Sequence, residues 1–147
     1  MALTSTPTRG ERNCNPGNLD YHPTIQWQGQ LGVEVLLNGE PRFARFSAPV
    51  WGIRAAAKEL INYITKDGCD TVEKIINRWA PPAENATSSY VRQVCNSTGF
   101  SPDQIMTATD NCIGPLVIAI IKQENGRCIY DGGVIKQAVA SALGESQ

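Results

Sequence analysis

The chain has 147 residues, enough for one domain with its own hydrophobic core and too few for two ordinary domains. Hydrophobic residues make up 41% and charged residues 18%, a balance typical of a folded globular protein and not of a disordered chain. The formal net charge is −1, which offers no excess of positive charge for binding a phosphate backbone. We therefore expect no nucleic-acid partner.

Membrane insertion and ordinary export are also not expected. No apolar stretch approaches the roughly 20 residues that a bilayer-spanning helix needs. The opening "MALTSTPTRG" has neither the basic nor the apolar region of a secretory signal peptide. If the protein acts outside the cytoplasm, something other than a signal peptide must deliver it.

The first third of the chain predicts loops and a β-hairpin. Residues 1–8 are expected to form a flexible lead-in, and the run "RGERNCNPGNLDYHP" is rich in Asn, Gly and Pro, the residues of irregular turns. Two short alternating runs, 33–37 and 42–46, flank "NGE". An Asn-Gly pair between such runs is a strong hairpin signal, so we predict two antiparallel strands here.

The remainder of the chain predicts helices. A helix over 51–64 has apolar residues at the spacing of one face, and a second follows "DTVEKIINRW", with Asp70 and Glu73 as its capping box and Pro81 beyond its end. Further helices are predicted over 87–99, in a short turn at "SPDQI", from Pro115 to the residue before Gly126, and over 133–143. The predicted fold class is mainly α (α+β), with a single domain over 9–147 and a small hairpin near its N-terminus.

Nothing in the sequence predicts a metal site or a cofactor. The five cysteines form no C-x-x-C pair, and we expect reduced thiols that are mostly buried. His22, the single histidine, precedes a proline in a predicted loop without the neighbours that a zinc site or a catalytic triad requires.

The segment "LVIAIIKQENG", residues 116–126, places a carboxylate at the end of an apolar helix. Glu124 lies three, four and seven residues after apolar positions, so it shares their helix face. Burial and the negative end of the helix dipole both disfavour a charged carboxylate, and we expect both to raise the pKa of Glu124. A carboxyl group tuned in this way suits a general acid. The alternative is that Glu124 faces water or pairs with Arg127.

The same segment resembles the catalytic helix of lysozyme-superfamily enzymes, in particular lytic transglycosylases. In those enzymes an apolar helix ends in a Glu that protonates the glycosidic oxygen between N-acetylmuramic acid and N-acetylglucosamine. The resemblance implies a lysozyme-like domain in which Glu124 is the catalytic acid.

A longer resemblance covers nearly the whole chain. The segments "RGERNCNPGNL", "WQGQ", "RFARFSAPVWGIRAAAKEL", "TVEKIINRWAPPAENATSSYV" and "AIIKQENG" resemble a family of small phage virion proteins, often described as structural proteins. This resemblance implies a place in a phage particle, other virion proteins as partners, or delivery to the bacterial periplasm.

The N-terminal half is also similar to the stretch that follows the active-site Glu in bacterial peptidoglycan glucosaminidases. Here the "QENG" helix comes after that stretch instead of before it. Either the order is permuted, or Glu11 in "RGERN" provides the acid from the N-terminal side. Glu11 lies in a polar run without an apolar helix to raise its pKa, so we rank Glu124 first and Glu11 second.

Four further residues are candidates for substrate binding. The amides of Asn15 and Asn18 could bind the N-acetyl and hydroxyl groups of a sugar, or could hold the loop together through backbone hydrogen bonds. Trp27, in a polar loop, could stack on a sugar ring. Tyr130 could orient the acid or the substrate, or could only fill the helix junction.

The predicted function is cleavage of the β-1,4 glycan strand of peptidoglycan. Glycosidases that use water need two carboxylates at a defined separation, and none of Asp20, Glu34 and Asp131 stands out as the second. A lytic transglycosylase needs only one carboxylate, so a lone Glu124 favours that reaction over that of a muramidase. Two alternatives remain open: a non-enzymatic virion or wall-binding protein, and an injected antibacterial toxin.

Overall fold

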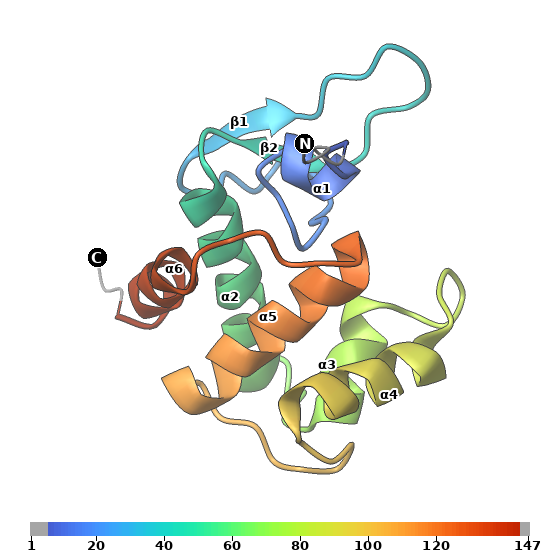
Figure 1. Ribbon diagram of the computed structural model, residues 1–147, viewed down its shortest axis with the longest axis vertical. Helices are drawn as coiled ribbons and strands as arrows, with labels where there is room; N and C mark the ends of the chain where they lie inside the picture. The colour runs from blue at the N-terminus through green and yellow to red at the C-terminus, as the bar shows by residue number, and fades with distance from the viewer. Residues whose placement is uncertain (1–5, 145–147) are drawn as a thin grey trace, which may run out of the picture.

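The protein is seen here in a computed structural model that describes residues 6–144, which form six helices and one two-stranded antiparallel sheet (Figure 1). The predicted class, mainly helical α+β with a small hairpin near the N-terminus, is confirmed. In chain order the elements are α1 Arg9–Arg12, β1 Gln30–Val33, β2 Ala44–Phe46, α2 Pro49–Thr65, α3 Val72–Trp79, α4 Thr87–Thr98, α5 Asp110–Asn125 and α6 Gly132–Gly144.

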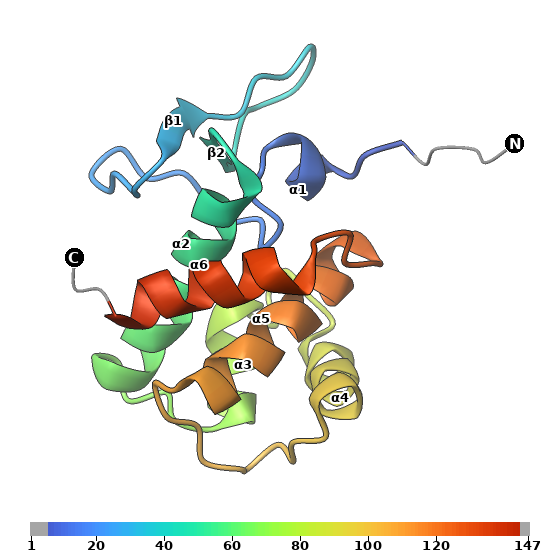
Figure 2. The same ribbon diagram turned by 60° about the vertical axis from the view of Figure 1, so that its left-hand side comes forward.

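Helix α5 runs through the middle of the helical part (Figure 1). It packs against α4 on one flank and against α2 and α6 on the other, and α3 packs against α4. The hairpin and α1 lie together at one end of the molecule, and α1 contacts α5 (Figure 2). This arrangement brings the C-terminal end of α5 next to the N-terminal segment.

Apolar helix faces form the main core. Buried side chains from every helix except α1 meet there, among them Ile53 and Leu60 of α2, Ile76 of α3 and Ile120 of α5. Full burial of each such side chain stabilises the fold by roughly 1.5–3 kcal/mol. A second, smaller cluster below the hairpin contains Leu19, Ala44, Phe46 and Ala55. The periodicity that predicted α2 is therefore the periodicity of its buried face.

The hairpin is present, and β2, Ala44–Phe46, falls within the predicted range 42–46, but β1 spans Gln30–Val33 and so lies earlier than the predicted 33–37. Gln30 pairs with Phe46 and Val33 with Ala44, with a bulge at the start of β1, so a ten-residue connection, 34–43, separates the strands. The Asn-Gly pair is at the tip of that connection and not in a two-residue turn between paired strands.

Glu34 explains why the strands end early. Its carboxylate is buried and accepts hydrogen bonds from the backbone N–H groups of Arg42 and Phe43, at 2.8 and 3.0 Å. Those donors are therefore satisfied by a side chain instead of by a longer ladder. Val35 and Leu37, which the alternating pattern assigned to a strand, are highly exposed.

Helix α4 starts at Thr87 as predicted, whereas helix α3 has a different cap from the predicted one. Helix α3 is capped by Thr71, whose side chain accepts from the N–H of Lys74, and not by Asp70, which instead forms an ion pair with Lys74 at 3.3 Å. Helix α4 has no side-chain cap, because its N-cap residue is Ala86; the hydroxyl of Thr87, its first residue, donates to the carbonyl of Ala80. That bond joins the start of α4 to the end of α3.

The region before α5 also differs. The predicted short helix at 101–105 is a turn, in which the N–H of Gln104 donates to the carbonyl of Ser101. Helix α5 begins at Asp110, so Pro115 lies inside the helix and not at its first position. Pro115 removes one backbone hydrogen bond of the helix, the one that an N–H at this position would donate to the carbonyl of Asn111. At the other end Gly126 has φ +75°, and it ends the helix as predicted.

The predicted lead-in, 1–8, lies mostly outside the described residues. Within it, Thr8 caps α1, and its hydroxyl donates to Asn125 at the end of α5, at 2.6 Å. All five cysteines are free, and each is half-buried and not fully buried. None of the helices in residues 6–144 combines the length and apolar character needed to cross a membrane.

Candidate active site

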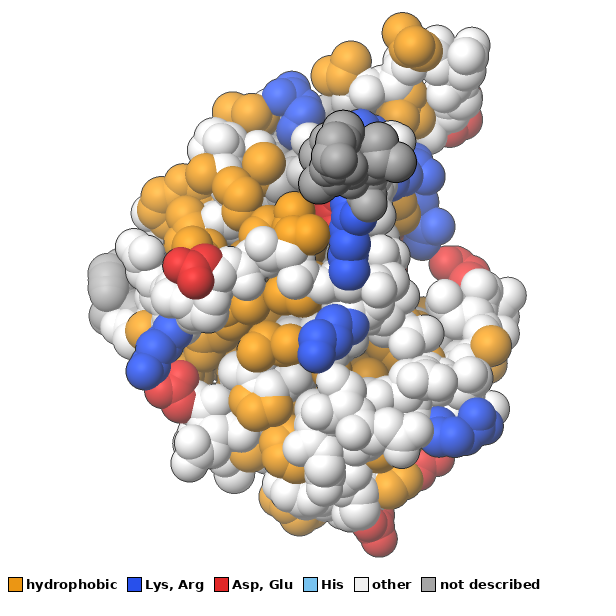
Figure 3. Space-filling model, in the orientation of Figure 1, with side chains coloured by type: hydrophobic (Ala, Val, Ile, Leu, Met, Phe, Trp, Pro, Cys, Tyr) orange, Lys and Arg blue, Asp and Glu red, His pale blue; other side chains and the backbone are white. Residues whose placement is uncertain are grey.

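A cleft of about 480 Å³ lies where the hairpin end of the molecule meets the helices. The space-filling view is indented at its right-hand edge, where basic and acidic side chains face each other (Figure 3). The lining comes from segment 17–27, from Arg42 and Phe43 before β2, from α2, from residues 78–85 around the end of α3, and from Glu124 of α5.

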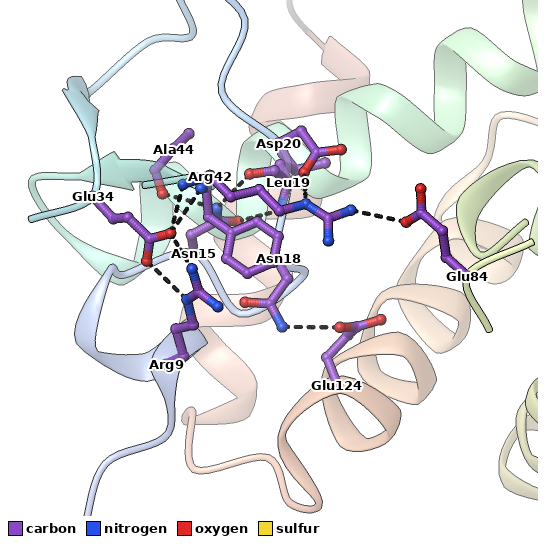
Figure 4. A network of polar contacts seen from close by, with 11 residues as sticks. Arg9, Asn15, Asn18, Leu19, Asp20, Glu34, Arg42, Ala44, Glu84 and Glu124 are labelled. Atoms are coloured by element: carbon purple, nitrogen blue, oxygen red, sulfur yellow. Dashed lines mark hydrogen bonds and ion pairs between the residues drawn. The ribbon is translucent and has the colours of Figure 1, made fainter. Parts of the chain in front are cut away.

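Glu124 is half-buried in this cleft, and both of its carboxylate oxygens are oriented. Oε1 accepts a hydrogen bond from the side-chain amide of Asn18, and Oε2 accepts one from the hydroxyl of Tyr90, both at 2.9 Å. Figure 4 shows Asn18 reaching down toward Glu124 from the N-terminal segment. The carboxylate is held between two neutral donors, and it does not pair with Arg127.

The backbone conformation of Asn18 directs its amide toward Glu124. Asn18 has φ +53°, in the left-handed region that asparagine tolerates better than most residues. The side-chain oxygen Oδ1 of Asn18 is buried and lacks a hydrogen-bond partner among the described residues. This oxygen lies close to Gly10: a Cβ atom added to Gly10 would be 3.1 Å from it. A glycine at position 10 thus makes room for the amide that positions Glu124.

Tyr90 brings a hydroxyl to the site from α4. Its ring is buried in the core where α4 packs against α5, and burial together with the neighbouring Glu124 raises the pKa of its phenol far above its ordinary value. The hydroxyl therefore stays protonated and remains a donor to Glu124 at all working pH values. No sequence signal singles out Tyr90, since an aromatic residue on a predicted helix is typical of a core position.

The end of α5 is joined to the N-terminal segment at successive residues. The amide of Asn125 donates to the carbonyl of Pro16 at 2.8 Å, while its oxygen accepts from Thr8. Two positions further on, the guanidinium of Arg127 forms an ion pair with Glu11. These contacts fix the loop that carries Asn18 relative to the helix that carries Glu124.

Glu11 is engaged in this junction and does not line the cleft. It accepts two hydrogen bonds from Arg127, at 2.6 and 2.9 Å, and forms a reciprocal capping box with Thr8. The hydrogen bonds from Arg127 hold the pKa of the Glu11 carboxyl below its usual range. A buried, ion-paired carboxylate of this kind stabilises the junction and has no proton to donate at neutral pH.

The other predicted binding residues occupy different places. Asn15 is fully buried and bonds to the backbone of Leu19 and Ala44, so it holds the loop together. Trp27 is half-buried and lines the cleft. Tyr130 does not line the cleft; it packs against the main core near Glu11, where burial raises the pKa of its phenol to about 12.

An ion-pair bridge lies over the cleft near Glu124. The guanidinium of Arg42 binds Asp20 at 2.7 Å and reaches Glu84 in the α3–α4 loop at 3.1 Å (Figure 4). All three side chains are largely exposed, so the pair to Glu84 contributes little to stability and can open readily. The bridge links the hairpin connection to the helical part.

Glu34 and Asp131, two candidates for a second carboxylate, lie outside the cleft lining. Glu34 receives hydrogen bonds from Arg9 and Asn13 as well as from the backbone, which keep its pKa far below the usual value. Its role is to anchor α1 and the hairpin connection. Asp131 is exposed just before α6. Asp20 lines the cleft but is bound to Arg42.

Sequence reasoning did not identify Glu59 as a site residue. This half-buried carboxylate of α2 lines the same cleft. Its one sequence signal is that it is the single acidic residue of α2 and lies next to the buried face of that helix. Across residues 6–144, no three His, Cys, Asp or Glu side chains gather in a way that could hold a metal ion.

Comparison with known proteins connects the chain to a phage. No protein-family model matches the sequence. The chain is 37% identical over 131 residues to "Protein P5" of Pseudoalteromonas phage PM2, an alignment that covers 88% of this chain and 78% of that protein.

Proposed function

The chain belongs to the family of Protein P5 of Pseudoalteromonas phage PM2, and within that family we propose that it is a virion-associated glycosidase. Its substrate is the β-1,4 glycan strand of peptidoglycan, cleaved between N-acetylmuramic acid and N-acetylglucosamine. Local opening of the wall when a phage infects its host is the step such an enzyme serves.

The observation that carries this proposal is the setting of Glu124. The carboxyl group stands at the end of an apolar helix, in a cleft of about 480 Å³, with one donor on each oxygen. Because Asn18 and Tyr90 fix its orientation, little reorganisation is needed when it meets a substrate atom. Proton transfer from a positioned carboxyl group is the essential step of glycoside cleavage.

In the proposed reaction Glu124, in its protonated form, donates to the glycosidic oxygen as the bond from that oxygen to the anomeric carbon breaks. The resulting carboxylate then removes a proton from the nucleophile that attacks the anomeric carbon. In a lytic transglycosylase the nucleophile is the 6-hydroxyl of the same sugar, and the product is a 1,6-anhydro ring. We favour this outcome because, of the predicted second-carboxylate candidates Asp20, Glu34 and Asp131, only Asp20 lines the cleft, and it is already bound to Arg42.

A direct test compares the wild-type protein with Glu124→Gln on purified peptidoglycan. We expect the wild type to release soluble fragments and the variant, which keeps the shape of the side chain but cannot donate an acid proton, to release none. Glu40→Gln is the matched control, since Glu40 is exposed in the hairpin connection and is not among the residues that line the cleft. Equal inactivity of wild type and Glu124→Gln would remove the enzymatic proposal.

A non-enzymatic role in the virion is the second candidate. Three large apolar side chains of β1 and the hairpin connection, Leu31, Val35 and Leu37, are exposed, and the hairpin lies at one end of the molecule (Figure 1). Exposed apolar side chains grouped in this way mark protein contact surfaces. If wild type and Glu124→Gln are equally inert and both pellet with cell walls, wall binding is the remaining activity.

A further inference from the structure

We propose that Glu59 and the aromatic residues around it form a saccharide-binding subsite in the same cleft, distinct from the reacting carboxyl group. The inference rests on the proposed function for the chemical class of the ligand, a β-1,4-linked chain of N-acetylated sugars. Glu59 would accept hydrogen bonds from sugar hydroxyl or amide N–H groups. The nearby rings would receive the apolar face of the sugar.

The geometry that supports this subsite begins on α2. Glu59 and Tyr63 are one turn apart on the helix, and both line the cleft together with Trp79 at the end of α3. The rings of Tyr63 and Trp79 pack edge to face, with centroids 6.2 Å apart. Each ring is only partly buried, so an aromatic surface is open beside a carboxylate.

Glu59 differs from the other acidic side chains of the cleft in having no partner. Asp20 and Glu84 bind Arg42, and Glu124 is held by two donors. No hydrogen bond or ion pair joins the Glu59 side chain to any residue in the described range, 6–144. A half-buried carboxylate without partners is costly, and burial accordingly raises its pKa. Donors from a bound ligand would satisfy it.

The positive groups nearest to Glu59 are committed elsewhere or exposed. Arg78 lies over the ring of Tyr63, with 5.3 Å between its guanidinium carbon and the ring centroid, and forms an ion pair with Asp67 at 3.4 Å. His22 lies at the exposed rim of the cleft. The acceptor capacity of Glu59 therefore remains for a ligand.

The ligand chemistry follows from the combination of an acceptor and flat rings. Sugars present hydroxyl and amide donors around their edge and an apolar C–H surface on each face, and aromatic side chains with polar neighbours complement both. Trp27 and Ile25 of segment 17–27 line the same cleft and widen the apolar surface. The cleft lining contains four carboxylates and two guanidinium groups. This excess of negative charge disfavours the binding of a polyanion such as nucleic acid.

The test measures binding without cleavage, so that its outcome is separate from that of the proposed function. The protein is Glu124→Gln, and the probe is the β-1,4-linked trisaccharide of N-acetylglucosamine, titrated by calorimetry. Addition of Glu59→Ala should weaken binding about tenfold or more, because a hydrogen bond to a charged acceptor is lost. Glu59→Gln, which keeps one acceptor oxygen, should lose less, and Tyr63→Ala should also weaken binding. Glu40→Ala should have no effect.

Two results would overturn the subsite. One is trisaccharide binding that Glu59→Ala and Glu59→Gln leave unchanged, with thermal unfolding showing both variants folded. The other is absence of any trisaccharide binding to Glu124→Gln at millimolar concentration, even if the wild-type protein cleaves peptidoglycan. Conversely, binding that depends on Glu59 would stand even if no cleavage is found.

Discussion

Glu124 and Asn18 lie 106 positions apart in the chain and are joined by a hydrogen bond of 2.9 Å. The bond connects the last turn of α5 to an irregular loop in which Asn18 takes a left-handed backbone conformation. Because the neighbouring residue Asn125 ties the same helix end to Thr8 and Pro16, the pair sits on a fixed junction. Orientation of the candidate acid is thus a property of the fold and not of one contact.

The variant Asn18→Gly should show the effect of losing the orientation of Glu124 without a large change in the stability of the fold. Glycine accepts the left-handed conformation of this position but removes the donor to Glu124, so we expect kcat on peptidoglycan to fall about tenfold or more, with the unfolding free energy nearly unchanged. Asn18→Ala should lose the same activity and be less stable than Asn18→Gly by about 1 kcal/mol, since alanine is strained there. Initial rates and urea denaturation measure both. A wild-type kcat for Asn18→Gly would show that the amide is not needed.

Tyr90→Phe should also lower kcat while leaving the core intact. The phenyl ring fills the same space, and only the hydroxyl that donates to Glu124 is removed. We expect a fall in kcat of about tenfold and a stability change of about 0.5–1.5 kcal/mol. Tyr21→Phe, under the hairpin, is the matched control and should keep full activity. Equal rates for the two variants would argue against a positioning role for Tyr90.

The protein should lose stability in acid through Glu34 and Glu11. Hydrogen bonds from arginine place the pKa of each carboxyl below the value of about 4.3 expected in the unfolded chain. Each therefore stabilises the fold above that pH, and the stabilisation is lost as pH falls through 4 toward the folded pKa. Urea denaturation between pH 7 and 3 should show this decline.

Glu34→Gln provides the control for that measurement. The variant should be about 1–3 kcal/mol less stable at pH 7, since Arg9 and two backbone N–H groups lose a charged acceptor. Its stability should vary less with pH than that of the wild type. A wild-type pH profile in Glu34→Gln would mean that other groups govern acid unfolding.

Glu84→Gln should change access to the cleft more than stability. The Arg42–Glu84 ion pair is exposed, so its loss should alter the unfolding free energy by less than about 1 kcal/mol. A long glycan strand must pass the bridge, and we expect a lower KM for polymeric peptidoglycan in the variant. Raising the salt concentration should also lower the KM of the wild type, because salt screens the ion pair, and should leave the KM of the variant almost unchanged. An unchanged KM would show that the bridge does not obstruct the strand.

Local signals predicted the elements well where local chemistry decides them. Gly126 ends α5, the residues before Pro81 end α3, and the apolar face of α2 is its buried face. The predicted bounds of β1 and the predicted start of α5 were wrong because distant contacts decide them. Burial of Glu34 against Arg9 shortens the strands, and an alternating pattern cannot show that a charged side chain will be buried.

The candidate site was only partly predictable for a similar reason. Glu124 stood out because its helix is so apolar, and the structure places it in the cleft lining, while its catalytic role stays a prediction. Tyr90 and Glu59 did not, since a helix pattern assigns each to its own element and says nothing about which elements meet. The hydroxyl of Tyr90 reaches Glu124 only because α4 packs on α5.

Mass spectrometry of the muropeptides released from purified peptidoglycan tests the central claim, that Glu124 transfers the proton, most directly. The account predicts fragments ending in 1,6-anhydro-muramic acid from the wild-type protein and intact strands from Glu124→Gln. Intact strands from both proteins, or the same fragments from both, would contradict it.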